Sequence, residues 1–553
     1  MTYFGIDLGT TYSVVSYVDE FGKPAVVRDL AENSETTPSV VYFENAGNVV
    51  VGAQAKNVAL LYPDRVVQRV KREMGQERLW EFDGEQYTPE KISALILKQL
   101  AQNAAEDTGR EVKDVVITVP AYFGMLERDA TRNAGRIAGL DVIGIVPEPV
   151  AAALQYEVAD ASRDRTVLVY DLGGGTFDTS VIRVTPTAVE VLCTDGDQAL
   201  GGVDWDDRLI EHILAEFDRS TSAADEARND PSFMQGLRDK AEDIKRQLTR
   251  MESRVLPVQF AGASASVNVT RDAFEQVTRD LLDNTLRCTD RTLELLAGKL
   301  GTTDAAGSID DVLLVGGSSK MPMVTAALAA KYGWKPRLHD PDLAVAKGAA
   351  RFALSRAVWA WDGDESARPT EQQRRERVSV IAQRAGVDEG ALARIAEKEI
   401  TTVLPKAFGV KLVDTSRPGW EKDPDSSSFV QHLVHANDTL PSGPRHFTAG
   451  TVVPNQREVS IEVYEQAGSE AAPEMASNKS VDKGEGLITD LPPLPANAPI
   501  DIVMNIDSEG LLEVKAAEPS SGKNLTIKVR ISLLSEEEVI DARSAVSLIA
   551  VRS

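Results

Sequence analysis

The sequence is poor in cysteine, histidine and aromatic residues, and the first two shortages each exclude a class of protein. With two cysteines, Cys193 and Cys288, among 553 residues, a disulfide framework is excluded, and the composition fits a reducing compartment. The five histidines show no metal-ligand spacing, and His432 and His435 are expected to have structural roles in strands or loops. Neither a disulfide-stapled secreted fold nor a histidine metal site is predicted.

Positive charge is also scarce. Lys and Arg together number 60 against 85 Asp and Glu, which gives a formal net charge of −25. Nucleic acids and anionic membranes need clustered positive charge on a protein partner, so neither is expected as a partner here. The first residues show no basic and apolar leader pattern, and no apolar run is long enough to span a bilayer. We therefore expect a cytoplasmic protein.

What the chain does have is length and glycine-rich turns. Its 553 residues suffice for several domains with their own cores. The stretch Asp171–Ser180, DLGGGTFDTS, joins two strand-like apolar runs. Glycines let backbone N–H groups surround a phosphate, and an Asp at a strand end can hold a hydrated cation. By itself such a turn is more often a plain hairpin than an anion site.

A second copy of this pattern lies near the N-terminus. Asp7–Ser13, DLGTTYS, follows the run Tyr3–Ile6 and precedes the strand-like run Val14–Val18. Two copies of strand, Asp-Leu-Gly, Thr-bearing turn and strand predict two similar lobes that face each other across a nucleotide.

The region up to about Ala357 alternates strand-like and helix-like segments, which is typical of an α/β domain. The patterns predict a hairpin of residues 39–43 and 48–51, a helix over Pro89–Thr108, a buried strand from Asp114 to Pro120 and a helix over Leu126–Ala138.

Three further patterns leave alternatives open. Glu148 begins an Ala-rich helix, where it either complements the helix dipole or faces a cation and an attacking water. The residues Glu242–Thr249 place four polar side chains on one helical face, which is more often solvated than ligand-binding. A third turn, Gly316–Lys320, joins a strand to a helix and suits a phosphate or ribose, although it lacks both the dinucleotide and the P-loop spacing.

Taken together, these segments strongly resemble the seventy-kilodalton heat-shock chaperone (heat shock protein 70) family over nearly all of residues 1–356. The resemblance rests on the ordered motifs GIDLGTTYS, ITVPAYF, PEPVAAAL, DLGGGTFD, DGDQALGGVDWDDRLI, LVGGSSKMPMV and DPDLAVAKGAA. It implies a two-lobed, actin-like (ribonuclease H-like) α/β ATPase domain followed by an all-β sandwich domain. We expect the ATPase domain at 1–357, a polar and helical linker or insertion at 358–404, the β-sandwich at 405–534 and a short helical tail, a truncated lid, at 535–553.

The resemblance also implies the activity, hydrolysis of ATP to ADP and phosphate, with ATP or ADP and Mg²⁺ bound and K⁺ as a further candidate cation. Asp7 and Asp171 would position the waters around Mg²⁺, and Lys71 would place the attacking water, with Glu148 and Thr176 completing its surroundings. Lys320 stands where the family has an arginine that stacks on adenine. Pro120 and Arg128 match an interlobe relay. The expected nucleotide contacts are Gly9, Thr10, Thr11, Tyr12, Gly173, Gly174, Gly175, Thr176, Gly201, Gly202, Glu242, Lys245, Arg246, Thr249, Gly316, Gly317, Ser318, Lys320 and Asp342.

The chain departs from the family after Ala357. The family's apolar linker is missing, and only Val403–Pro405 remains where it would be, after a charged, helix-like segment over Glu371–Ile400. Coupling of the nucleotide to the β-domain is therefore expected to be altered, and trapping of peptide by a closing lid is not expected. Gly144 and Pro147 replace an arginine and an asparagine that help to dock J-domain co-chaperones, so that partnership is left open.

From about Lys406 to Ser532 the pattern predicts eight alternating strands, a generic β-sandwich that is as compatible with a structural as with a peptide-binding role. Local resemblance favours peptide binding, with Phe447 and Val459 at the pocket. The leading hypothesis is an ATP-dependent chaperone for extended polypeptides or one dedicated protein partner, with a nucleotide-exchange factor as a further candidate partner. The alternative is a nucleotide-dependent switch or scaffold. A sugar-kinase-like enzyme is disfavoured because no sugar-binding domain is evident.

Overall fold

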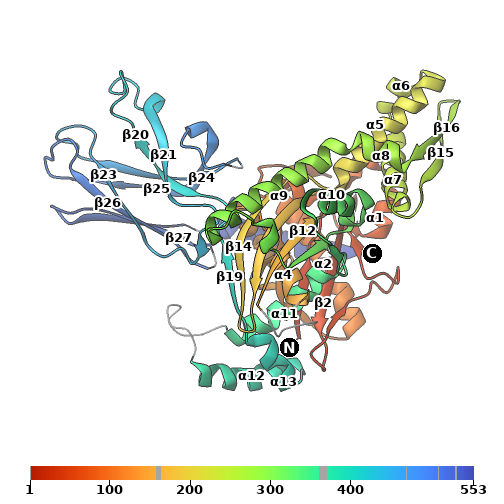
Figure 1. Cartoon of the computed structure of the whole chain (residues 1–553), viewed down its shortest axis with the longest axis horizontal. Coiled ribbons are helices and arrows are strands. Elements are labelled where there is room, and N and C mark those ends of the chain that lie inside the picture. The colour runs from red at the N-terminus through yellow and green to blue at the C-terminus, as the bar shows by residue number, and fades with distance from the viewer. Residues whose placement is uncertain (1, 157–163, 360–369, 469, 509, 530–531) are drawn as a thin grey trace. The chain divides into compact units, whose positions relative to one another are not determined.

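The computed structural model describes residues 2–156, 164–359, 370–468, 470–508, 510–529 and 532–553 (Figure 1). The chain divides into two compact units. Unit 1 consists of Met1–Tyr122, Ala130–Ile400 and Leu534–Ser553, and unit 2 of Phe123–Asp129 and Thr401–Leu533. The polar stretch 361–370 of the expected linker lies, except for its last residue, outside the described residues.

Unit 1 is built on two sheets that share one strand order. The first runs β11-β10-β1-β2-β3, and the first five strands of the second, seven-stranded sheet run β18-β17-β12-β13-β14. In each sheet the central strand, β1 or β12, pairs in parallel with a later strand and antiparallel with its hairpin partner. The duplication that the two Asp-Leu-Gly turns indicate is thus present in the strand order. The bounds are β1 Thr2–Asp7, β2 Tyr12–Val18, β3 Pro24–Val26, β10 Val112–Val119, β11 Asp141–Pro147, β12 Arg165–Leu172, β13 Phe177–Val184, β14 Ala188–Asp197, β17 Asp311–Val315 and β18 Arg337–Leu338.

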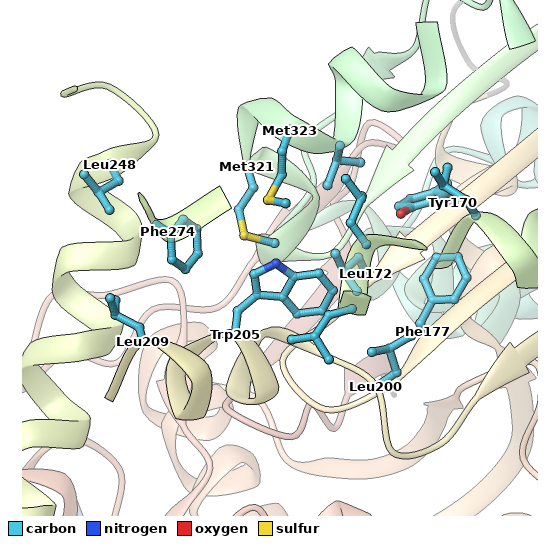
Figure 2. Close-up of a cluster of buried hydrophobic side chains, with 14 of the residues drawn as sticks. Tyr170, Leu172, Phe177, Leu200, Trp205, Leu209, Leu248, Phe274, Met321 and Met323 are labelled. Carbon is cyan, nitrogen blue, oxygen red and sulfur yellow. The ribbon is translucent and has the colours of Figure 1, made fainter. Parts of the chain in front are cut away.

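Strand β13 is buried at seven of its eight positions, which is typical of central strands covered on both faces. Helix α9 (Arg279–Leu300) lies against β13 and β14 on one face of the second sheet (Figure 1). Figure 2 shows Trp205 of α5 (Gly202–Thr221) at the centre of the apolar core beside this sheet, close to Met321 and Leu172. The two cysteines, Cys193 and Cys288, are free thiols buried in the same core.

The remaining helices of unit 1 begin and end where local signals place them. Thr88 caps α2 (Pro89–Thr108) by accepting a hydrogen bond from the Lys91 N–H, and Gly109 ends it at φ 66°. The predicted hairpin is β5 (Val40–Asn45) and β6 (Asn48–Val51). The division between the units falls within α3 (Met125–Ile137). Other bounds are α1 Ala53–Val58, α4 Glu148–Tyr156, α6 Ala224–Arg228, α7 Pro231–Leu248, α8 Arg271–Val277, α10 Pro322–Tyr332, α11 Ala344–Trp359, β4 Thr37–Pro38, β7 Val66–Gln68, β8 Trp80–Phe82, β9 Glu85–Tyr87, β15 Ser253–Phe260 and β16 Ala263–Thr270.

The charged segment after residue 370 folds as a helical hairpin on α11. It consists of α12 (Glu371–Ala385) and α13 (Glu389–Ala396), and the indole N–H of Trp359 in α11 donates to the Ala396 carbonyl at 3.0 Å. The prediction that this segment is helical up to Ile400 is wrong for its last residues, because β19 (Glu399–Val403) begins there. Ile400, Thr401 and Thr402 are β-branched and favour a strand. The Glu399 N–H donates to the Thr187 carbonyl at 2.9 Å, next to β14.

The last residues of the chain also belong to unit 1. Helix α14 (Glu536–Leu548) is followed by a short strand, β29 (Ala550–Arg552), which pairs in parallel with β6 in the sheet β29-β6-β5-β7. The sequence pattern predicts a short helix here, and the strand is an addition that it does not predict.

Unit 2 is an all-antiparallel sandwich of two four-stranded sheets, β21-β20-β24-β25 and β23-β26-β27-β28. In β26 the buried positions alternate with partly or fully exposed ones, as a half-buried strand requires. Each of the eight predicted segments overlaps one of these strands. The short strand β22 (Thr439–Leu440), which pairs with β19, was not predicted. The bounds are β20 Phe408–Val413, β21 Ser428–Val434, β23 Arg445–Gly450, β24 Val459–Gln466, β25 Asn478–Ile488, β26 Pro499–Ile506, β27 Leu512–Glu518 and β28 Lys523–Val529.

Among the described helices, none combines the length and the apolar character that crossing a bilayer requires.

Candidate active site

A cavity of about 660 Å³ lies in unit 1, and both sheets contribute to its lining. The ends of β1 and β12 supply Asp7 and Asp171, and the turns that follow these strands form part of its wall. Of the residues expected to contact ATP or take part in its hydrolysis, it brings together Asp7, Gly9, Thr10, Thr11, Tyr12, Lys71, Glu148, Asp171, Gly173, Gly174, Thr176, Glu242, Lys245, Arg246, Thr249, Gly316, Gly317, Ser318, Lys320 and Asp342.

The two Asp-Leu-Gly turns lie directly against each other. A Cβ atom on Gly174 would stand 2.4 Å from Thr11 Oγ1, and one on Gly175 would stand 2.5 Å from the Thr10 side chain. Any larger residue in the second turn would therefore push the first turn away. The glycines keep the backbone of one turn and the threonines of the other at one end of the same cavity.

The remaining predicted glycines stand just behind this wall. The Gly202 N–H donates to the Gly173 carbonyl at 2.9 Å, so the start of α5 is fixed to the glycine turn. A Cβ atom on Gly201 would stand 2.5 Å from the backbone nitrogen of Gly175. These contacts position the cavity wall, although Gly175, Gly201 and Gly202 do not line the cavity themselves. The lining residues are their neighbours in the sequence, Gly173, Gly174, Thr176 and Val203.

A lysine and three carboxylates meet at the floor of the cavity. Lys71 Nζ lies 2.6 Å from Glu148 Oε1, and both side chains are less than a tenth exposed. Thr118 donates a hydrogen bond of 3.0 Å to Asp7 Oδ1. Asp171, near the end of strand β12 of the second sheet, completes the group.

The electrostatics of this group favour an added cation. Burial and the nearby Glu148 raise the pKa of Asp7 to about 7, although Lys71 acts against them. Burial, followed by Glu148, raises the pKa of Asp171 well above its usual value. Burial alone would lower the pKa of Lys71, but Glu148 and Asp7 outweigh it and raise the value. One ammonium thus offsets three carboxylates only in part.

Direct metal ligation is not built into this group. Within the described part of the chain, no three His, Cys, Asp or Glu side chains are arranged so that they could hold a metal ion. The carboxylates of Asp7 and Asp171 are only partly compensated by Lys71, so they still attract a cation. The arrangement therefore fits a hydrated ion, held through its water shell, better than an ion that the side chains bind directly.

Polar side chains from distant segments meet at another part of the cavity. Lys56 Nζ lies 2.5 Å from Glu242 Oε2 and 3.1 Å from the Tyr12 hydroxyl oxygen. The Tyr12 hydroxyl donates to Glu242 Oε1 at 3.1 Å, and the Arg246 guanidinium lies 4.9 Å from the centre of the Tyr12 ring. Burial alone would raise the pKa of Glu242, but Lys56 and Arg246 outweigh it, so the pKa is lowered. This Glu242 network joins α7 to the first residue of β2.

The third glycine-rich turn, Gly316–Lys320, forms another part of the cavity wall. Gly316 adopts φ 80°, and a Cβ atom there would stand 2.4 Å from the Leu172 carbonyl oxygen, so glycine is required. Lys320 and Asp342 form an ion pair beside it. Lys245 Nζ donates to the Gly202 carbonyl at 2.7 Å and pairs with Asp206 at 2.8 Å. The helical face that spacing alone assigns to solvent therefore borders the cavity.

Comparison with known proteins decides the family. The family model described as Hsp70 protein matches residues 3–82, 77–356 and 424–546, well over half of the chain. The chain belongs to the Hsp70 family.

Curated Hsp70 relatives match almost the whole chain. The chaperone protein DnaK of Thermotoga neapolitana is 35% identical over 547 residues, which cover 97% of this chain and 81% of the relative. Chaperone protein DnaK of Halobacterium salinarum is 34% identical over 547 residues, which cover 97% and 76%. The Hsp70 match extends beyond the ATPase motifs into the β-sandwich, whereas residues 357–423, which contain the helical hairpin, fall outside the matched ranges.

The other residues expected from the Hsp70 resemblance are not among those that line the cavity. Pro120 is buried just after β10, and Arg128 in α3 donates from Nε to the Phe123 carbonyl at 2.9 Å. In unit 2, Phe447 of β23 and Val459 of β24 are partly buried and pack against the sandwich core.

Two lining residues that take part in the ion pairs of this Hsp70 cleft, and one arginine beside its glycine turn, were not predicted from the sequence. Lys56, in the short helix α1, joins the Glu242 network, and Asp206 pairs with Lys245. Arg72 donates from Nε to the Gly175 carbonyl at 2.9 Å and pairs with Asp204 at 2.5 Å. Arg72 directly follows the predicted Lys71, which is the one local signal that points to any of the three.

Proposed function

We propose that this chain is an ATP-dependent molecular chaperone of the Hsp70 class, which binds and hydrolyses ATP in the cavity of unit 1 and holds extended polypeptide on unit 2. The observation that carries the proposal is the convergence of both Asp-Leu-Gly turns, Lys71, Glu148 and the Glu242 face on one cavity. The relatives bear the name chaperone protein DnaK over nearly the whole length of this chain. The common strand order of the two sheets supports an actin-like, two-lobed ATPase architecture.

Hydrolysis in this cavity is chiefly a matter of position and charge. Transfer of a phosphoryl group to water asks the protein to orient the water and to stabilise charge on the phosphate oxygens. Lys71 is held by its ion pair with Glu148, so its ammonium is fixed before the nucleotide arrives. Glu148 and Thr176 orient the attacking water. Thr10 and Thr11 in the first turn and the backbone of Gly173–Thr176 in the second turn bind the phosphates.

Asp7 and Asp171 are the residues that would hold a hydrated Mg²⁺, and their raised pKa values fit this role because an added cation relieves the repulsion between buried carboxylates. When bound, Mg²⁺ supplies neutralisation of the phosphate charge. K⁺ is a further candidate cation at the same group. The two buried, free thiols support a reducing, cytoplasmic location.

The nucleoside would be held between the Glu242 face and the Gly316–Asp342 wall. Arg246 would stack on the adenine, and the facing position carries Lys320, whose compact ammonium lacks the planar surface of a guanidinium. In the structure Lys320 pairs with Asp342, which keeps its charge beside this wall.

Lys320→Arg is therefore expected to tighten nucleotide binding by about two- to fivefold, since stacking of a guanidinium on an aromatic ring contributes about 0.5–1 kcal/mol at exposed sites. The measurement is titration with a fluorescent ADP analogue. Lys331→Arg is the matched control, because Lys331 forms a similar exposed ion pair, with Asp290, and does not line the cavity. Equal or weaker binding by the Lys320 variant would remove the stacking role from this position.

Client binding is tested by fluorescence anisotropy with a panel of unrelated unfolded peptides, with and without ATP. We expect binding to many peptides and weaker binding in ATP, which distinguishes a chaperone from a switch or scaffold with one dedicated partner. Binding to none of the peptides would contradict the chaperone proposal.

The pocket on unit 2 is tested in the same assay. Val459→Asp is expected to weaken peptide binding about tenfold, because an unpaired charge replaces an apolar surface. Leu487→Asp is the control, since Leu487 is a half-exposed residue of the neighbouring strand β25. Equal effects of the two changes would place the pocket elsewhere.

A further inference from the structure

The chain's last strand covers the edge of a small sheet in the ATPase unit. β29 pairs in parallel with β6, with Val551 beside Val49 and Arg552 beside Val50. The Ala550 N–H donates to the Gly47 carbonyl at 2.9 Å. An edge strand presents unpaired N–H and C=O groups that attract another strand, and here residues 550–552, the tail strand, occupy that edge.

A single lysine fixes the junction between α14 and the tail strand. Lys98 of α2 donates from Nζ to the carbonyls of Val546, Ser547 and Ile549 at 3.0, 3.4 and 2.8 Å. The last carbonyls of a helix have no partner within the helix, and a positive charge is favourable at that end. Lys98 therefore binds the C-terminal end of α14 at the point where the chain turns into the strand.

Apolar burial and an ion pair complete the contact. Val546 and Val551 are buried, whereas the neighbouring Leu548 is 85% exposed. Arg552 donates from Nη2 to both carboxylate oxygens of Glu44, each at 2.8 Å, next to the β5–β6 turn. The contact thus has an apolar position, Val551, flanked by a hydrogen-bonded backbone and a charged anchor, which is the pattern of a specific strand-binding site.

The sheet that accepts the tail strand also carries cleft residues. β6 leads through Gly52 into α1, whose Lys56 belongs to the Glu242 network. On the other side of β5, β7 is followed by Arg69 and Lys71, and both line the cavity. A shift of this sheet would move Lys56 and Lys71 together. The tail strand, which is the fourth strand of the sheet, restrains such a shift.

We propose that the edge of β6 is a strand-binding site whose occupant is the chain's own tail strand, residues 550–552, and that its occupation slows nucleotide release by restraining the sheet that carries Lys56 and Lys71. This inference rests on the proposed function, because it assumes that the nucleotide binds in this cavity. By reciprocity, a nucleotide that stabilises the sheet strengthens the docking of the tail strand.

The test compares Val551→Asn with Leu548→Asn in the full chain. Both changes introduce the same side chain, one at a buried strand position and the other at an exposed helix position. Release of a fluorescent ADP analogue is followed by stopped flow, and hydrogen exchange of the β6 amides reports docking of the tail strand independently of any nucleotide. We expect Val551→Asn to speed release about fivefold or more, the lower range of typical coupling between sites, and to lower protection in β6. Leu548→Asn should change neither quantity.

A second variant keeps the outcome decisive. Ala550→Pro removes the N–H that bonds to Gly47 and blocks strand pairing at that point. Lower β6 protection in either variant, with an unchanged release rate, would overturn the proposal, as would unchanged protection in both. Failure of the unmodified protein to bind ADP would instead refute the proposed function, while the exchange data would still report on the tail strand.

Discussion

Replacing Lys71 with alanine is expected to lower the rate constant for ATP hydrolysis about 10²- to 10³-fold, the usual effect of removing one preorganised charge-stabilising group from an active site. Lys71 supplies an ammonium beside Glu148, Asp7 and Asp171 at the floor of the cavity. The nucleoside end of the cavity is formed by other residues, so ATP binding is expected to change only a few-fold. Single-turnover hydrolysis with labelled ATP and equilibrium titration with a fluorescent analogue measure the two quantities separately.

Lys113→Ala is the control for this variant, because Lys113 is half exposed and pairs with Asp141 on the surface. Its turnover should match that of the unmodified protein. The Lys71 variant also leaves buried carboxylates less compensated, so a thermal melt should accompany the kinetics to establish that it is folded. Undiminished turnover in a folded Lys71→Ala protein would refute the proposed hydrolytic role of this residue.

Gly201→Ala is expected to weaken nucleotide binding at least tenfold and to lower the free energy of unfolding by about 1–3 kcal/mol, the usual cost of inserting an atom into a closely packed site. The new Cβ atom would stand 2.5 Å from the Gly175 nitrogen, and a backbone atom gives way less easily than a side chain. The start of α5 would have to move away from the glycine turn. Urea unfolding and nucleotide titration give both values.

Gly298→Ala is the control for this variant, and the same substitution is expected here to raise the free energy of unfolding. Gly298 lies in α9, and a Cβ atom there would meet nothing within 4 Å. Alanine is the better helix former, so this variant should be about 0.5–1 kcal/mol more stable, with unchanged nucleotide binding. If both glycine variants behaved alike, the close packing of α5 against the glycine turn would not be what shapes the phosphate wall.

Features with strong local signals were predicted well from the sequence. The bounds of α2 follow from Thr88 and Pro89 at its start and Gly109 after its end. The two Asp-Leu-Gly turns indicated the duplicated sheets because the repeat is visible in the residues themselves. The eight strands of unit 2 follow from their alternation of apolar and polar positions.

Features that depend on distant partners were not predicted. Lys56 joins the cleft through Glu242, which lies 186 positions away, and no local pattern marks such a pair. Lys98 meets the Ile549 carbonyl across 451 positions. The tail strand has only three residues, too few for an alternating pattern, and it forms because β6 offers an edge. Likewise β19 begins where the Thr187 carbonyl, just before β14, accepts the Glu399 N–H, inside a segment whose charge pattern favours a helix.

The burial of both thiols determines how this protein can be labelled. Burial raises the pKa of Cys193 to about 12 and that of Cys288 to about 11, so neither is a reactive thiolate near neutral pH. A cysteine introduced on the surface would therefore be the preferred target of maleimide reagents without removal of the native pair. One dye would be attached to a cysteine at position 548 in α14, and the other to a cysteine at an exposed position of a helix that covers the second sheet. Energy transfer between the two dyes in single molecules would then report the distance between α14 and the second sheet as nucleotide binds and leaves.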